Sequence, residues 1–254
     1  MRDQFRLGAI EVAPDEYCDQ MMLQAWAKST HVNAGDRSET ILRNLSQSGT
    51  VNTAFYCTVM KAHKGNADRV EALLHQMYGA YLQGNESLKP TRQAFHMVLE
   101  SCSKSVSRQV ADRAQALLGR MDHLSKSGTL QGVKPTTQTY NLVLNCLTTS
   151  QAKDAGDRAE SLLREMQSEF QQGDANCEPT RDTFKAVMRA WAQVGRTDRV
   201  EAVLKELVGA YQNSPKASNR RLAPDLVSVH IVLQACRATR DAERAHRLLT
   251  HVEE

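Results

Sequence analysis

Apolar side chains recur along the chain at a spacing that predicts helices. The segment "AGDRAESLLREM", residues 155 to 166, places Ala159, Leu162, Leu163 and Met166 at positions i, i+3, i+4 and i+7, which form one face of an α-helix. The template returns in "NADRVEALLHQM" from residue 66, "VADRAQALLGRM" from 110 and "RTDRVEAVLKEL" from 196, and more loosely in "AGDRSETILRNL" from 34 and "DAERAHRLLTHV" from 241. The pattern is therefore an internal repeat.

A second apolar stripe precedes each of these segments, as in Phe184, Val187, Met188 and Trp191. Each unit therefore reads as two helices, and the units span about 14–50, 51–89, 90–134, 135–178, 179–223 and 224–254. Hairpins with an exposed apolar face must stack on their neighbours to bury it. The sequence predicts an all-α fold, an α-solenoid of about six helix-turn-helix repeats and about twelve helices, forming a superhelical array. We expect residues 1–254 to form this single array, as a portion of a longer protein.

An Asp-Arg pair recurs at the start of each second helix. Asp157 stands directly before the apolar run and Glu160 follows it by three residues, which is the spacing of a capping box. We expect the carboxylate of Asp157 to accept backbone N–H groups of the helix end, and the arginines to be solvated or paired with acids one turn away. This reading makes the pair structural.

Composition excludes several classes of protein. With 41% hydrophobic residues and a net charge of +3, the chain can bury a core, and its charge permits RNA without requiring it. Neither a membrane-spanning run nor a signal peptide or organellar presequence is visible. The six cysteines are scattered singly, so we expect reduced thiols and no metal site. Motifs of hydrolases, phosphate-binding loops, zinc proteases and deaminases are absent, so we expect no enzyme, catalytic residue, cofactor or small-molecule substrate.

The unit "KPTTQTYNLVLNCLTTSQAKDAGDRAESLLREM", residues 134 to 166, resembles the pentatricopeptide repeat. The resemblance lies in the proline, the Tyr-Asn pair opening the first helix and the Ala-x-x-Leu-Leu-x-x-Met second helix. The Trp-x-x-Leu-Gly opening of the rival tetratricopeptide repeat is absent. Several units are lengthened to about 44–45 residues, against about 34 in comparable helical repeats.

The resemblance implies binding of single-stranded RNA, one base per unit, by side chains of the first helices. The main base readers would be Gln20, Cys57, His96, Asn141, Lys185 and His230, which lie off the packed stripe. The second readers would be Asn52, Thr91, Thr136, Thr180 and Asp225, and Lys185 and Arg189 would also contact phosphates. The family further implies a role in organellar RNA processing, stability or translation, in a mitochondrion or chloroplast.

One alternative stays open. The concave groove of the solenoid would bind a peptide or protein subunit, and the chain would act as a protein-protein interaction scaffold. A continuous positive groove over the first helices would favour RNA, and a neutral or mixed groove would favour protein.

Overall fold

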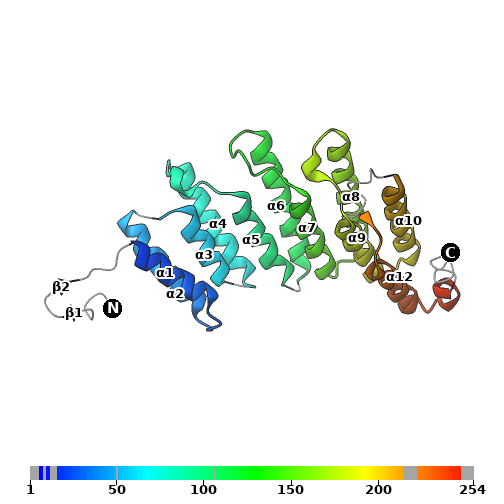
Figure 1. The fold of residues 1–254 in the computed structure, drawn as a ribbon, viewed down its shortest axis with the longest axis horizontal. Coiled ribbons are helices and arrows are strands. Elements are labelled where there is room, and N and C mark those ends of the chain that lie inside the picture. The colour runs from blue at the N-terminus through cyan, green and yellow to red at the C-terminus, as the bar shows by residue number, and fades with distance from the viewer. Residues whose placement is uncertain are drawn as a thin grey trace. The chain divides into compact units, whose positions relative to one another are not determined.

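The computed structural model describes residues 6–7, 10–11, 16–49, 51–63, 65–105, 107–213 and 222–246. The described chain is all-α apart from one short pairing near its start, where two-residue strands β1 (Arg6–Leu7) and β2 (Ile10–Glu11) lie antiparallel. The helices are drawn in Figure 1. They fall into two compact units, Met1–Ser101 and Cys102–Glu254.

The first unit contains two helical hairpins. Its elements are α1 (Glu16–Lys28), α2 (Ala34–Ser48), α3 (Thr53–Ala62), α4 (Ala67–Leu82), the 3₁₀ turn η2 (Glu86–Leu88) and most of α5 (Arg92–Ser103). Within it, α1 packs on α2, α3 packs on α4, and α3 also contacts both helices of the first hairpin. Each hairpin is thus covered by its neighbour in sequence, as repeats require.

The second unit repeats this packing. Its elements are α6 (Arg108–Lys126), α7 (Thr137–Thr149), α8 (Ala155–Gln171), η3 (Ala175–Cys177), α9 (Arg181–Gln193), α10 (Thr197–Asn213) and α12 (Leu226–Thr239). Helix α9 contacts α7 and α8 of the preceding hairpin, its own partner α10, and the next first helix, α12. The first helices α7, α9 and α12 therefore lie next to one another (Figure 1).

The apolar stripes form the core, as predicted. Phe184, Val187, Met188 and Trp191 of α9 are all buried, with at most 4% of any of them exposed. The stripe of α8, from Ala159 to Met166, is equally buried. In the last repeat, residues 242–246 are helical and begin the expected second helix, whose stripe residues Leu248, Leu249 and Val252 lie outside the described residues.

The second helices begin earlier than the capping prediction requires. Helix α8 starts at Ala155 and α2 at Ala34, so Asp157 and Asp36 lie inside the first turn instead of at the N-cap. Helix α4 is capped by Asn66, whose side chain accepts from the N–H of Arg69. The capping-box interpretation of the Asp-Arg pairs is therefore wrong, because each helix begins before its aspartate and the aspartate lies within it.

Two connectors between repeats are partly ordered by local hydrogen bonds. In η2 and η3 the side chains of Asn85 and Asp174 accept from a backbone N–H two residues later. The Thr137 hydroxyl at the start of α7 lies 2.9 and 2.8 Å from the carbonyl oxygens of Asn176 and Glu178, and Thr53 of α3 makes the equivalent contacts in the first unit. In these two repeats, the bonds hold the connector at the end of the repeat against the first helix of the same repeat.

Candidate functional site

The arginines of the Asp-Arg pairs connect consecutive repeats. Four of them bind the acid or amide that lies two residues after the corresponding arginine of the preceding repeat. The pairs are Arg69 with Glu39, Arg158 with Gln115, Arg199 with Glu160, and Arg244 with Glu201. The expectation that the arginines are solvated or paired one turn away holds in part for Arg158, which also pairs with Asp154 at 3.7 Å. It misses the main contact, because four of the arginines bridge two second helices.

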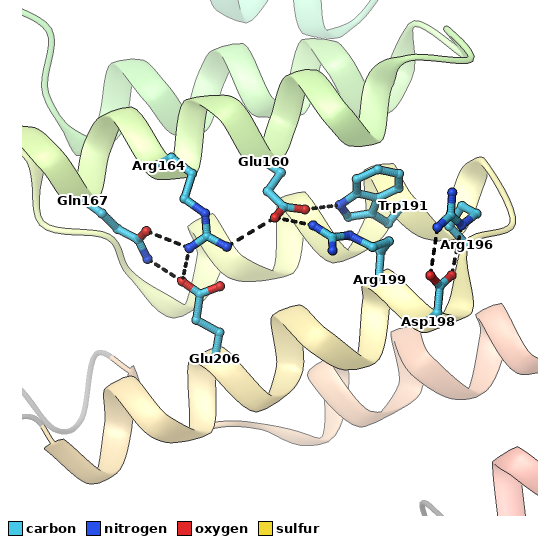
Figure 2. Close-up of polar contacts among 8 residues, drawn as sticks. All are labelled: Glu160, Arg164, Gln167, Trp191, Arg196, Asp198, Arg199 and Glu206. Carbon is cyan, nitrogen blue, oxygen red and sulfur yellow. Dashed lines mark hydrogen bonds and ion pairs between the residues drawn. The ribbon is translucent and has the colours of Figure 1, made fainter.

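Glu160 is the best connected of these acids (Figure 2). One of its carboxylate oxygens accepts from Arg199 and, at 3.2 Å, from Arg164, while the other accepts from Trp191 Nε1 at 3.0 Å. Arg164 also donates to Glu206 of α10 at 2.8 Å. The carboxylate thus joins helix α8 to both helices of the next hairpin.

The Trp191 ring lies flat against a glycine of the preceding repeat. A Cβ placed on Gly156 would stand 2.3 Å from the ring, so only glycine fits this position of α8. The guanidinium of Arg199 lies 5.5 Å from the ring centroid, within the range of a cation–π contact. We call Gly156, Glu160, Trp191 and Arg199 together a ring clamp.

A second ring clamp occurs in the first unit. There a Cβ on Gly35 would stand 2.4 Å from the His63 ring, His63 Nε2 lies 2.8 Å from a Glu39 oxygen, and Arg69 binds the same carboxylate. The sequence carried a signal for both clamps, the repeated "AGDR-x-E", but the ring that completes each one lies in the next repeat.

The clamps favour ionised carboxylates. Burial acts to raise the pKa of Glu160, but the bonds from Arg199, Trp191 and Arg164 outweigh it and leave the pKa below its ordinary value. The pKa of Glu39 is lowered in the same way, with Arg69 and His63 opposing the effect of burial. Because the polar groups of each clamp bind one another, their arrangement fits a structural joint.

The expected main base readers lie one per first helix, on α1, α3, α5, α7, α9 and α12. His230 is exposed, and Gln20, Cys57 and Asn141 are half-buried. Asn141 Oδ1 accepts from the Thr183 hydroxyl at 2.8 Å, which ties α7 to α9. In the second unit, Asn141, Lys185 and His230 stand at equivalent positions of the contacting first helices α7, α9 and α12, which we call the α7–α9–α12 face.

Two of these residues are less open than the sequence suggested. His96 is buried, with 3% of its surface exposed, and burial lowers its pKa, helped by the charge of Arg92. The expectation that this position lies off the packed surface is therefore wrong at His96. Lys185 is half-buried and pairs with Asp182 at 2.8 Å and with Asp225 at 3.2 Å.

The expected second readers all lie directly before first helices. Asn52 Oδ1 accepts from the N–H groups of Ala54 and Phe55, and Asp225 accepts from Ser228. Thr136 and Thr180 form capping boxes, and the carbonyl of Thr91 accepts from Ala94. N-capping accounts for the residue types at Asn52, Thr136, Thr180 and Asp225. An RNA contact at these four positions would have to use side chains that already cap helices.

Charge is distributed unequally between first and second helices of the second unit. Helix α9 carries three cations and one acid, α12 one cation, and α7 no charge. By contrast, α8 carries four acids and two cations, and α10 three acids and two cations; α6 is the exception, with four cations and two acids. Arg189 and Arg237 are exposed, so the α7–α9–α12 face offers uncommitted positive charge.

Four cysteines are buried, namely Cys102, Cys146, Cys177 and Cys236. Burial raises the pKa of Cys146 and of Cys177 to about 12, which keeps both thiols protonated at neutral pH. In the described part of the chain, no three His, Cys, Asp or Glu side chains are grouped so as to hold a metal ion. The same residues include no helix with the length and hydropathy to span a membrane.

No protein-family model matches the chain, and no curated protein matches it.

Proposed function

We propose that the chain is a pentatricopeptide-type solenoid that binds single-stranded RNA along its first helices. The observation that supports this most is the face of α7, α9 and α12. It combines hydrogen-bonding side chains at the expected reader positions, one per helix, with a net positive charge. Unpaired bases offer hydrogen-bonding edges, and the backbone between them is anionic.

The continuous array is part of the same proposal. Within each unit, every hairpin packs on the next one in sequence, and nearest-neighbour packing of this kind builds solenoids. An extended row of first helices suits a strand that passes one repeat after another. The organellar role in RNA processing, stability or translation is what the family resemblance adds.

Binding is tested by fluorescence anisotropy with a random pool of single-stranded RNA at moderate salt. We expect Arg189→Glu and Arg237→Glu, taken one at a time, to weaken binding by about tenfold and to reduce the salt slope by about 0.7 per lost phosphate contact. Both side chains are exposed, so neither substitution should disturb the fold.

The matched control is Lys205→Glu, which changes the charge equally at an exposed position of α10. It should leave binding nearly unchanged. No binding by the natural chain, or equal losses in all three variants, would contradict the RNA proposal and favour the protein-scaffold alternative.

A further inference from the structure

Helix α1 exposes the face that later first helices bury. Cys18, Met21 and Met22 are exposed, with 49% and 38% of the two methionines accessible. Their counterparts in α9 are Thr183, Ala186 and Val187, each at most 2% exposed. In α9 this face is covered by α7 and α8 of the preceding repeat, so the structure itself shows which kind of element fits against such a surface.

Trp26 of α1 occupies the ring position of a clamp. It lies seven residues after Asp19, as Trp191 lies seven after Phe184 and His63 seven after Tyr56. Trp26 is half-buried and makes an edge contact with the His31 ring. Among the described residues no glycine stands against its ring and no carboxylate accepts from its indole N–H.

Arg37 of α2 gives a second, independent indication. Its counterparts Arg69, Arg158, Arg199 and Arg244 each bind a glutamate or glutamine of the preceding repeat. Arg37 is exposed, and its guanidinium has no hydrogen bond or ion pair within the described residues. In the two complete clamps the ring and the arginine bind one carboxylate, so the first hairpin presents both donors without the acceptor.

We propose that this face, formed by Cys18, Met21, Met22, Trp26 and Arg37, is an interface for a partner helical hairpin of the same repeat type. The partner's second helix would carry Gly-x-x-x-Glu. Its glycine would lie on the Trp26 ring, and its glutamate would accept from Trp26 Nε1 and from Arg37. The apolar part of the face explains affinity through burial, and the donor pair explains selectivity for an acid at a fixed distance from the glycine.

Helices α2 and α8 of this chain carry Gly-x-x-x-Glu, but neither can bind the exposed face of α1. Gly35 already lies against His63 and Gly156 against Trp191, and an added Cβ fits neither position. A second copy of the chain would therefore have no unoccupied Gly-x-x-x-Glu surface in its described residues. This favours a different polypeptide segment as the partner.

The test supplies such a hairpin in the natural register. A copy of residues 135–178, which includes α7 and α8, replaces residues 1–13. Residue 178 of the copy is then joined to Pro14, just as residue 178 of the natural chain is joined to Pro179. We expect Trp26 to lose its acrylamide quenching down to the level of the buried Trp191, with each signal isolated by Trp26→Phe or Trp191→Phe. We also expect Cys18 to lose its reaction with thiol reagents.

Substitutions in the fusion distinguish a specific ring clamp from nonspecific coverage of Trp26 and Cys18 by the added hairpin. Gly156→Ala in the grafted copy alone should restore quenching of Trp26. Arg37→Glu should weaken protection of Cys18, and Glu160→Arg in the graft should then rescue it. Circular dichroism confirms that each fusion is helical.

The proposal is overturned if the helical fusion leaves Trp26 and Cys18 as accessible as in the original chain, or if grafted alanine protects as well as glycine. Protection of the original chain that rises with its own concentration would assign the face to a second copy, which also contradicts the proposal.

Discussion

Gly156→Ala tests the ring clamp with a single methyl group. The added Cβ would stand 2.3 Å from Trp191 Cε3 and 2.5 Å from Cδ2, so the buried ring must move. A shift of the ring also takes its N–H away from Glu160, which now accepts it at 3.0 Å.

The expected effect follows from three contributions. Overpacking a core costs about 1–3 kcal/mol, and weakening a hydrogen bond to a charged group costs about 1.5 kcal/mol or more. Replacing a helical glycine by alanine contributes about 1 kcal/mol in the opposite direction. We therefore expect a net loss of about 2 kcal/mol in the free energy of unfolding, measured by urea denaturation and circular dichroism.

The chain provides matched controls. Gly119 of α6 is also helical but has open space around its Cβ position, so Gly119→Ala should stabilise by about 0.5–1 kcal/mol. At the equivalent joint between α6 and α7, the natural residues are Ala111 and Leu147. The double change Gly156→Ala with Trp191→Leu should therefore cost less than the sum of its parts, by about 1–3 kcal/mol. Equal stabilisation by both alanines would refute the clamp.

Three further predictions concern individual contacts. Because the folded pKa of Glu160 lies below its ordinary value of 4.5, its contribution to stability is fully present above that value and is lost as pH falls through the folded pKa; Glu160→Gln should flatten the acid side of a stability-against-pH curve, and an unchanged curve would contradict this. Asn52→Ala should lower the free energy of unfolding by about 1 kcal/mol through loss of the α3 cap, whereas Asn52→Ser should keep the cap, so a thermal melt that ranks the two alike would exclude capping. Thr137→Val should cost about 1 kcal/mol in urea denaturation by removing the hydroxyl that binds the connector carbonyls, and a neutral result would show that the connector is held by other contacts.

The hairpins could be predicted because helix periodicity is a local property. The i, i+3, i+4, i+7 spacing of Phe184, Val187, Met188 and Trp191 fixes which side of α9 must be buried, and all four residues are buried. The capping boxes at Thr136 and Thr180 were not predicted, because both residues were assigned from the sequence as base readers.

The joints between repeats could not be read in the same way. Arg199 and Glu160 are separated by 39 residues, and their meeting depends on the length of the intervening turn and on the packing of α8 against α9. Glu160 follows Asp157 by three residues, and this spacing alone predicted a capping box. Only the packed neighbour shows that this acid receives Trp191 and Arg199 instead.

The burial of the expected base readers also could not be predicted from the sequence, because it depends on how neighbouring helices pack. His96 has the same register as Asn141 and His230, but it is buried whereas they are half-buried and exposed. A position that lies off the stripe of its own helix can therefore still be covered by neighbouring elements.

Ultraviolet crosslinking of the bound RNA pool, followed by mass spectrometry of the crosslinked peptides, locates the RNA on the protein. Binding along the first helices predicts crosslinks to peptides of α7, α9 and α12, including those with Asn141, Lys185 and His230. Crosslinks confined to the second helices α8 and α10, or no crosslinks at RNA concentrations that saturate the anisotropy signal, would contradict it.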